Sequence, residues 1–497
     1  MATTDSPETN VHGLLIGGER RLGSDGGVLD RFNPAHPSEL VARVARATPA
    51  DVRAAYDAAA EAAPAWRRTP GPKRGEILFR AAELLNSSVD SLGEELAREE
   101  GKTLAEGRGE VARAAQILRW FAGEASQPVG DVLPSANTTT FLWSERVPLG
   151  VVCVITPWNF PVAIPVWKLA PALAFGNTVV WKPSELTPLC AVRVAEALTE
   201  AGLPAGVLNV VYGLPSEIGD AVTGDERIAG LTFTGSTATG RAIQQSVVGR
   251  GVKVQLELGG KNPVIVLDDA DLEQAVEQTL RGAMMSTGQK CTATSRALVL
   301  PGIRAAFTER LAERAAALTV GDPLLAQTQI GPLVSEAQQQ RVLGYLDVAA
   351  EEGHTLLAGG RGAAALPAGG QADGWFVAPT VYDRVDPASR LGQEEVFGPV
   401  VGVIAVDSLE HAVEVANGTQ YGLSASIFTR DIARAFAFVR EVEAGMIHVN
   451  SETAGAEPQA PFGGTKASSS GSREQGKAAV TFFTETKTVY LDMPAGG

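Results

Sequence analysis

The stretch GVVCVITPWNFPVAIPVWKLAPALAFGNTVVW (residues 150–181) decides the fold of this 497-residue chain. It begins with one short run of β-branched and apolar residues, GVVCVI, and ends with another, NTVVW. Continuous runs of this kind are typical of strands that are buried on both faces of a sheet. Prolines and Lys168 interrupt the segment, so it is not a membrane span. We therefore predict two buried strands within a globular protein.

Further segments of the same strand character follow along the chain. They are GVLNVVYG (206–213), LTFTGS (231–236) and VQLELGG (254–260), and helical segments such as TPLCAVRVAEALTEAG (187–202) lie between them. Strands that alternate with helices predict βαβ units and a parallel, twisted sheet. Such a sheet places ligands beyond the carboxyl ends of its strands.

The regions that flank this series indicate more than one domain. Residues 48–125 have the apolar rhythm of helices, and a second α/β series begins at residue 263. A chain of this length is too long for one core, so we predict two large α/β domains. Two segments, 138–149 and 482–492, alternate polar and apolar residues. We expect them to form a small sheet that pairs with another subunit, because a long unpaired edge invites aggregation. A local two-stranded flap fits the same pattern.

The composition excludes several classes of function. A net charge of −15 argues against a nucleic-acid or anionic-membrane partner, because phosphate binding needs clustered Lys and Arg. The three cysteines are far apart and contain no C-x-x-C pair, which indicates a reducing compartment without disulfides. No two of the five histidines have ligand spacing, so we expect no metal site. The polar N-terminus is not a signal peptide, and the cytoplasm is the simplest location.

Several residues stand where parallel strands end, and each has an ordinary structural interpretation as well as a chemical one. Cys291, in GQKC, is a nucleophile or a small buried residue. Asn159, in TPWNFP, is a fixed hydrogen-bond donor or a turn residue. Glu257, in LELGGK, is a desolvated general base or a strand-end carboxylate in water. Gly235, in FTGSTATG, opens a helix that can seat a phosphate or makes a plain turn.

Seven short motifs together resemble the aldehyde dehydrogenase superfamily in order and spacing. They are TPWNFP, WKPSE, FTGSTATG, LELGGK, GQKC, EEVFGP and PFGGTK, and the resemblance runs from about residue 12 to 492. It implies a Rossmann-like parallel-sheet cofactor domain formed by residues 1–128 and 149–258. It also implies an α/β catalytic domain at 259–470 and a small β oligomerisation flap formed by 129–148 and 471–497.

The resemblance also implies roles for individual residues. Cys291 matches the nucleophile, Glu257 the general base, Asn159 the side-chain half of the oxyanion hole, and Lys168 a lysine of the active-site motif. The expected cofactor is NAD or NADP. The residues expected to hold it are Trp158, Lys182, Ser184, Glu185, Gly219, Phe233, Gly235, Ser236, Leu258, Glu395 and Phe397. The residues expected to line an apolar substrate tunnel are Phe160, Ile164, Trp167 and Phe462.

Two departures from the family pattern point to a subgroup. Ser286 stands where many members have Asn, and KASSSGSREQG (466–476) has extra serines. We interpret neither as touching the residues with chemical roles. AMMSTGQKC and REQG are most similar to bacterial α-ketoglutaric semialdehyde (2,5-dioxopentanoate) dehydrogenases. We hypothesise that Arg281 meets a substrate carboxylate, since Arg suits bidentate pairing, although a solvent-facing Arg fits equally well.

Other functions remain open at this point. An aldehyde dehydrogenase of another range would oxidise aliphatic, aromatic or amino aldehydes. A CoA-acylating relative would pass the acyl group to CoA, but such members generally lack the glutamate that Glu257 matches. A non-catalytic homologue would not need Cys291, Glu257 and Asn159 together. The expected partners are a small aldehyde and further copies of this chain, as a homodimer or homotetramer.

Overall fold

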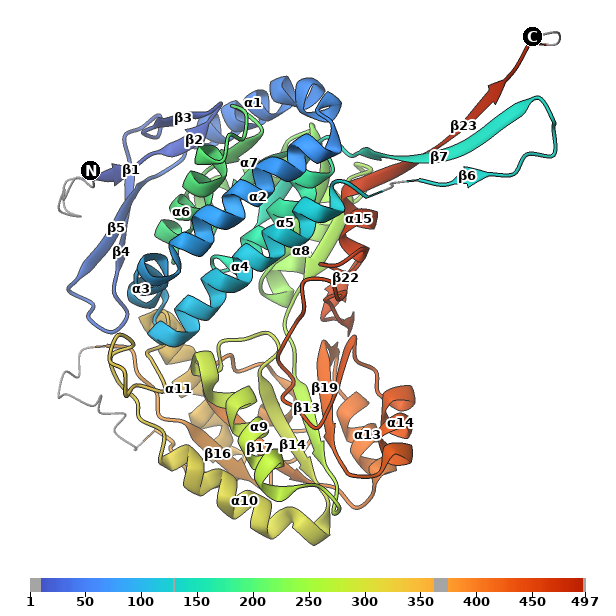
Figure 1. Cartoon of the computed structure of the whole chain (residues 1–497). Coiled ribbons are helices and arrows are strands. Elements are labelled where there is room, and N and C mark those ends of the chain that lie inside the picture. The colour runs from blue at the N-terminus through green and yellow to red at the C-terminus, as the bar shows by residue number, and fades with distance from the viewer. Residues whose placement is uncertain (1–9, 128–129, 362–373, 495–497) are drawn as a thin grey trace.

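Two sheets and a projecting β arm organise the computed structural model, which describes residues 10–127, 130–361 and 374–494 (Figure 1). The eight-stranded sheet has the order β22-β12-β11-β8-β9-β10-β2-β3, and the seven-stranded sheet has the order β15-β16-β17-β14-β13-β19-β20. The arm is the three-stranded sheet β23-β7-β6. The predicted mixed α/β fold with parallel sheets is confirmed.

The eight-stranded sheet contains the stretch that decides the fold. GVVCVI forms β8 (Val151–Ile155), NTVVW forms most of β9 (Thr178–Lys182), and the two strands pair in parallel. The other strands are β2 (Leu14–Ile16), β3 (Glu19–Arg21), β10 (Leu208–Val210), β11 (Ile228–Thr234), β12 (Lys253–Glu257) and β22 (Ser469–Ser470). β8 to β12 run parallel, whereas β2 and β22 pair antiparallel to their neighbours.

Helices cover this sheet and separate its strands. They are α1 (Pro49–Arg68), α2 (Gly71–Ser87), α3 (Val89–Glu100), α4 (Leu104–Glu124), α5 (Ala163–Ala174), α6 (Pro188–Glu200), α7 (Pro215–Gly224) and α8 (Thr237–Val247). Thr48 caps α1 in a capping box with Asp51, and Thr103 caps α4 in the same way with Glu106. Each box satisfies backbone N–H groups that have no partner within the helix. The helices predicted within residues 48–125 are therefore present. A three-stranded sheet packs beside them, formed by β1 (Val11–His12), β4 (Val28–Phe32) and β5 (Leu40–Ala45).

The second α/β series forms the seven-stranded sheet. Its strands are β13 (Asn262–Val266), β14 (Thr294–Val299), β15 (Thr355–Ala358), β16 (Thr380–Asp383), β17 (Val400–Ala405), β19 (Ser424–Phe428) and β20 (Met446–Val449). Its helices are α9 (Leu272–Met284), α10 (Pro301–Ala316), α11 (Glu336–Glu351), α12 (Arg390–Gln393), α13 (Leu409–Asn417) and α14 (Ile432–Glu441). The short strands β18 (Tyr421–Gly422) and β21 (Thr465–Lys466) pair beside it. None of the described helices combines the length and apolar character needed to cross a membrane.

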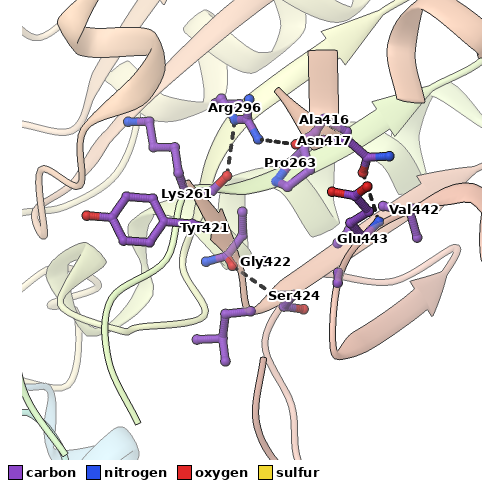
Figure 2. A pocket seen from close by; sticks show the side chains of 14 residues that line it. Lys261, Pro263, Arg296, Ala416, Asn417, Tyr421, Gly422, Ser424, Val442 and Glu443 are labelled. Carbon is purple, nitrogen blue, oxygen red and sulfur yellow. Dashed lines mark hydrogen bonds between the residues drawn. The ribbon is translucent and has the colours of Figure 1, made fainter. Parts of the chain in front are cut away.

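A buried arginine ties helix α13 to this sheet (Figure 2). The Arg296 guanidinium donates to the backbone oxygens of Lys261 at 3.1 Å, Val415 at 3.0 Å and Ala416 at 3.0 Å. Val415 and Ala416 lie in the last turn of α13, whose carbonyl groups have no partner within the helix. Burial lowers the pKa of Arg296 to about 9. The cavity beside Arg296 measures about 10 Å³, which leaves room for one water molecule. We therefore interpret the role of Arg296 as structural.

The two alternating segments pair with each other. β7 (Thr140–Pro148) and β23 (Thr484–Asp492) form an antiparallel ladder along their full length, and β6 (Val132–Leu133) joins the other edge of β7. The arm extends away from both sheets, and the short helix α15 (Ala478–Phe483) leads into it (Figure 1). The predicted small sheet is present. The domain boundaries and the contact with another subunit stay predictions.

Candidate active site

Nine of the predicted residues line one cavity of about 480 Å³. They come from both sheets: Trp158, Asn159, Ile164, Gly235, Ser236, Leu258, Cys291, Glu395 and Phe397. Trp158 and Asn159 follow β8, Gly235 follows β11 and Leu258 follows β12, all at the carboxyl ends of parallel strands. This is where parallel sheets bind ligands. The volume lies within the usual range of small-molecule and cofactor sites.

The other predicted residues, Glu257 included, do not line this cavity. Lys168, Trp167, Phe462 and Phe233 are buried, and Phe160 is half-buried. The Trp167 and Phe462 rings pack with centroids 5.1 Å apart. Lys182, Ser184 and Glu185 follow β9, whereas Gly219 lies in α7. Arg281 is exposed in the last turn of α9.

The loop that carries Cys291 has a strained backbone. Ser286 and Thr287 both have φ of 53°, and Gly288 has φ of 67°, so three successive residues adopt the left-handed conformation. Non-glycine residues rarely adopt it, and each costs about 1–3 kcal/mol unless the surroundings impose it. Glu106 provides one such restraint, because its Oε1 accepts the Ser286 backbone N–H at 2.6 Å.

Two asparagine side chains hold the same loop. Asn159 Nδ2 donates to the Gln289 carbonyl at 2.9 Å. Asn262 Nδ2 donates to the carbonyls of Cys291 and Ala293 at 2.8 and 2.9 Å. A carboxamide has two N–H bonds, so Asn159 keeps one for a ligand beside Cys291. Preorganised donors at such a position stabilise a negative charge that develops on a substrate oxygen.

The Cys291 thiol is protonated in this environment. Burial raises its pKa well above the ordinary value, and the carboxylates of Glu395, Glu257 and Glu474 raise it further. A protonated thiol is a weak nucleophile and needs a base to remove its proton. A carboxylate with a raised pKa can act as that base.

Glu257 is such a carboxylate. It ends β12 and is 2% exposed. Burial raises its pKa well above the ordinary value, and the nearby Glu474 carboxylate adds to the effect. Ser469 Oγ donates to Oε2 at 2.6 Å, while Oε1 has no hydrogen-bond partner among the described residues. The interpretation that the serine-rich segment leaves the chemical residues untouched is therefore wrong. Sequence alone could not place Ser469, because β22 reaches β12 only through the fold.

Lys168 is neutralised by Glu474, which was not among the predicted site residues. Its Nζ donates to Thr232 Oγ1 at 2.8 Å and forms a close ion pair with Glu474. Both charged side chains are almost fully buried. A buried charge without a partner would be strongly destabilising, so each residue requires the other.

A match to a family model decides the identity of the chain. Residues 22–489 match the aldehyde dehydrogenase family. The chain belongs to this family. It is therefore an NAD(P)-dependent oxidoreductase that converts aldehydes to carboxylic acids.

Individual relatives resemble this dehydrogenase over nearly their full length. It is 46% identical to the α-ketoglutaric semialdehyde dehydrogenase of Bacillus subtilis, covering 97% of this chain and 99% of that one. It is 43% identical to a betaine aldehyde dehydrogenase of Cereibacter sphaeroides, covering 92% of each. The crystal structure of PnpE, from Pseudomonas sp. WBC-3, in complex with nicotinamide adenine dinucleotide aligns with a TM-score of 0.93. That alignment has 38% identity and covers 98% of each chain.

The cavity of the dehydrogenase fits a dinucleotide. Gly235 and Ser236 precede α8, and the free N–H groups of a helix start suit a phosphate. Glu395 Oε1 accepts the Gly260 backbone N–H at 2.9 Å, and burial raises the pKa of Glu395 to about 7. A Cβ at Gly259 would lie 2.3 Å from the Glu395 carboxylate, so glycine leaves room for that carboxylate. The Trp158 and Phe397 rings meet edge to face at 5.4 Å.

Further residues line the cavity although they were not predicted. Thr237 and Ala238 belong to the FTGSTATG motif, whereas segments without a recognisable motif contribute Arg241, Gln338, Arg341, Gln420 and Tyr421. Gln338 Nε2 donates to the Phe397 carbonyl at 2.8 Å, and Arg341 donates to the Glu395 carbonyl at 3.0 Å. These two residues lie on α11 and fix the EEVFGP segment. Only the packing of α11 against that segment reveals them.

A buried ion pair fixes the backbone of Asn159. Lys102 Nζ donates to the Asn159 carbonyl at 2.8 Å and to Glu110 Oε2 at 2.6 Å. Glu110 Oε1 accepts the backbone N–H groups of Val162 and Ala163 at 2.8 and 3.0 Å. Lys102 also lies 4.1 Å from the centre of the Phe160 ring. The pair therefore fixes residues 159–163, from Asn159 to the start of α5.

Replacing Lys102 should slow the reaction while the cofactor still binds. Lys102→Met removes the hydrogen bond to the Asn159 carbonyl, and loss of one charged hydrogen bond costs about 1.5–3 kcal/mol. We expect kcat with propanal to fall about tenfold or more, with an unchanged KM for the cofactor. Lys73→Met, on the exposed face of α2, is the control. An unchanged kcat in Lys102→Met would show that the ion pair does not position Asn159.

The raised pKa of Cys291 predicts how the enzyme reacts with iodoacetamide. Without cofactor, the rate of Cys291 alkylation should keep rising above pH 9, because only the thiolate reacts. The rate is measured by mass spectrometry of the peptide that contains Cys291. Cys153 and Cys190 are buried and should stay unmodified in the native enzyme. A rate that levels off below pH 8 would contradict the prediction.

Proposed function

We propose that this dehydrogenase oxidises an aldehyde that also carries a carboxylate, α-ketoglutaric semialdehyde (2,5-dioxopentanoate), to α-ketoglutarate. The observation that carries the proposal is the 46% identity with the Bacillus subtilis enzyme of that name over nearly the whole of both chains. The positive charge of Arg281, beside the Cys291 loop, also supports an acidic substrate.

Two cationic residues lie together beside the Cys291 loop. Lys290 directly precedes Cys291 and is buried, and its Nζ donates to the Arg281 carbonyl at 3.4 Å. Burial lowers the pKa of Lys290, the Glu452 and Glu106 carboxylates raise it, and the Arg281 charge lowers it. Glu452 lies 3.6 Å from the Lys290 ammonium group and balances its charge. In this proposal Arg281 supplies the positive charge that attracts a substrate carboxylate and repels a cationic aldehyde such as betaine aldehyde.

The proposed reaction uses Cys291, Glu257 and Asn159. Glu257 removes the thiol proton, and the Cys291 sulfur bonds to the aldehyde carbon. The resulting oxyanion is stabilised by Asn159 Nδ2 and the Cys291 backbone N–H, and losing one such donor typically costs ~10²–10³ in rate. When bound, NAD(P)⁺ supplies a hydride acceptor. Cys291 then carries the acyl group as a thioester. Glu257 releases the thiol proton to solvent and is again a carboxylate. It then takes a proton from water as the water oxygen attacks the thioester, and it returns this proton to the sulfur as the carboxylic acid leaves.

The remaining predicted residues have supporting roles in this proposal. Ile164 lines the cavity, and we assign Phe160, Trp167 and Phe462 to an apolar path for the substrate chain that continues from it. Lys168 neutralises Glu474. The residues that would hold the cofactor are Trp158, Lys182, Ser184, Glu185, Gly219, Phe233, Gly235, Ser236, Leu258, Glu395 and Phe397. Lys182 donates to Glu185 at 3.2 Å, which leaves an ammonium group and a carboxylate for ribose hydroxyls or a 2′-phosphate. This arrangement supports either NAD or NADP.

The charge of the substrate gives a sharp test. We expect kcat/KM for 2,5-dioxopentanoate to exceed that for pentanal, which has the same length and no charge. Arg281→Ala should lower kcat/KM for the acidic aldehyde about tenfold and leave pentanal unchanged, since a charged hydrogen bond contributes about 1.5–3 kcal/mol. Arg310→Ala, which alters an exposed arginine of α10, is the matched control. Equal losses for both aldehydes would contradict the role of Arg281, and a preference for betaine aldehyde would contradict the substrate.

We also propose that the enzyme is a homodimer or homotetramer that assembles through the β arm. β23 lies at the edge of its sheet, and its end is apolar and exposed, with Tyr490 69% and Leu491 49% exposed. Phe141, on the paired strand β7, is 50% exposed. An exposed apolar edge of this length favours a partner strand. The cytoplasm is the proposed location, because the three cysteines are free; recovery in another cell fraction would contradict it.

Light scattering after size exclusion tests the assembly. The parent enzyme should elute as a dimer or tetramer, and the double substitution Tyr490→Asp with Leu491→Asp should shift it toward monomers, because charge at a buried contact is costly. Phe79→Asp alters an equally exposed aromatic residue on α2, away from the arm, and should not change the assembly. A monomeric parent would contradict the proposal.

A further inference from the structure

The general base proposed above is held by the serine-rich segment. Ser469 and Ser470 form β22, which pairs antiparallel with the end of β12, so that Ser469 lies opposite Glu257. Ser469 Oγ is 2.6 Å from Glu257 Oε2. The neighbouring Ser468 backbone also takes part, because its carbonyl accepts the Leu258 N–H at 2.8 Å. The strand pairing, this backbone hydrogen bond and the side-chain contact therefore fix Ser469 relative to the carboxylate.

The direction of the hydrogen bond follows from a second contact. The Gly464 backbone N–H donates to Ser469 Oγ at 2.6 Å, which uses one lone pair of the hydroxyl oxygen. An ionised carboxylate can only accept. The Ser469 hydroxyl hydrogen therefore points to Glu257 Oε2 whenever Glu257 is charged, and the bond favours that charged form.

The two oxygens of Glu257 are not equivalent. Oε2 is bonded to Ser469, whereas Oε1 is buried without a partner among the described residues. Oε1 lies against Gly463, where a Cβ would come within 2.6 Å of it. Gly463 also has φ of 144°, which a side chain would strain. This glycine keeps the space beside Oε1 open.

We propose that Ser469 is a positioning residue for Glu257: it anchors Oε2 and thereby presents Oε1 as the oxygen that takes the proton. The inference rests on the proposed role of Glu257 as general base. Ser469 itself touches neither substrate nor cofactor in this scheme.

Other charged groups also act on Glu257, and they set the sign of the expected effect. Glu474 raises its pKa, whereas Lys168, Arg473 and the Ser469 hydroxyl lower it, and burial raises it most. Cys291 faces the same carboxylate. Removing the Ser469 hydroxyl leaves every other group in place, so the pKa of Glu257 should rise. The base must be deprotonated to work, and its activity should then begin at a higher pH.

Hydrolysis of an acetyl-enzyme tests this without cofactor. 4-Nitrophenyl acetate acylates Cys291 and releases 4-nitrophenolate, and the burst counts the correctly folded sites. The rate at which the acetyl group then leaves is measured against pH. In Ser469→Ala we expect the acid limb of this profile to move up by about one pH unit, which lowers the rate about tenfold below the midpoint. Ser469→Thr keeps a hydroxyl and should return the limb toward that of the parent.

Two controls separate this inference from a structural effect. Ser472→Ala alters a neighbouring serine whose hydroxyl has no hydrogen-bond partner among the described residues, and it should retain the parent profile. In a Glu257→Gln background, Ser469→Ala should cause no further change. A Ser469→Ala profile that superimposes on the parent, or an equal shift in Ser472→Ala, would overturn the inference alone. A burst that survives Cys291→Ser, or parent-like hydrolysis in Glu257→Gln, would overturn the proposed function itself.

Discussion

The rest of the site depends on the hydrogen bonds that two asparagine side chains donate to the Cys291 loop. Asn159 reaches the Gln289 carbonyl from the eight-stranded sheet, and Asn262 reaches the Cys291 and Ala293 carbonyls from the seven-stranded sheet. Both contacts follow directly after the left-handed residues 286–288, and they help to hold that strained backbone in place. The reactive sulfur is thus held at a junction between two sheets, each of which has its own core. A cavity that needs groups from both sides can form only there.

Buried charges explain how such a site stays stable while it keeps unusual protonation states. Lys168 is paired with Glu474, and Lys102 is paired with Glu110, so neither cation is isolated. Lys102 has a second carboxylate 4.0 Å away in Glu100, and burial raises the pKa of Glu100 to about 7. One ammonium group cannot neutralise two buried carboxylates fully, which is consistent with a shifted second acid. Glu257 differs from both pairs because its contact is a neutral hydroxyl, so its charge is stabilised only in part.

The sequence predicted the residues that stand at the ends of strands. It did not predict the residues from other segments that position them. GVVCVI, NTVVW and LELGG predict buried strands from local pattern. Asn159 follows the first run and Glu257 lies in the last, and the family resemblance implies their roles. Lys102, Glu110 and Ser469 have no such signal, because they acquire their partners only when segments of the chain pack together. Gln338 and Arg341 were not predicted as cavity residues for the same reason. Arg281 lies where a charged substrate group can approach from solvent, so its exposure leaves its role to experiment.

The segment from Phe462 to Gln475 links the site to the arm. Within it, Phe462 packs on Trp167, Ser469 bonds to Glu257, Glu474 pairs with Lys168, and Gln475 accepts from Arg113 at 3.3 Å. The chain then runs directly through α15 into β23. A force on β23 would therefore act on the same backbone that holds the base and its neighbours. Packing of a second copy against the arm would restrain this backbone at one end while β12 restrains it at the other. One continuous stretch of chain therefore connects the proposed contact between copies with the proposed base.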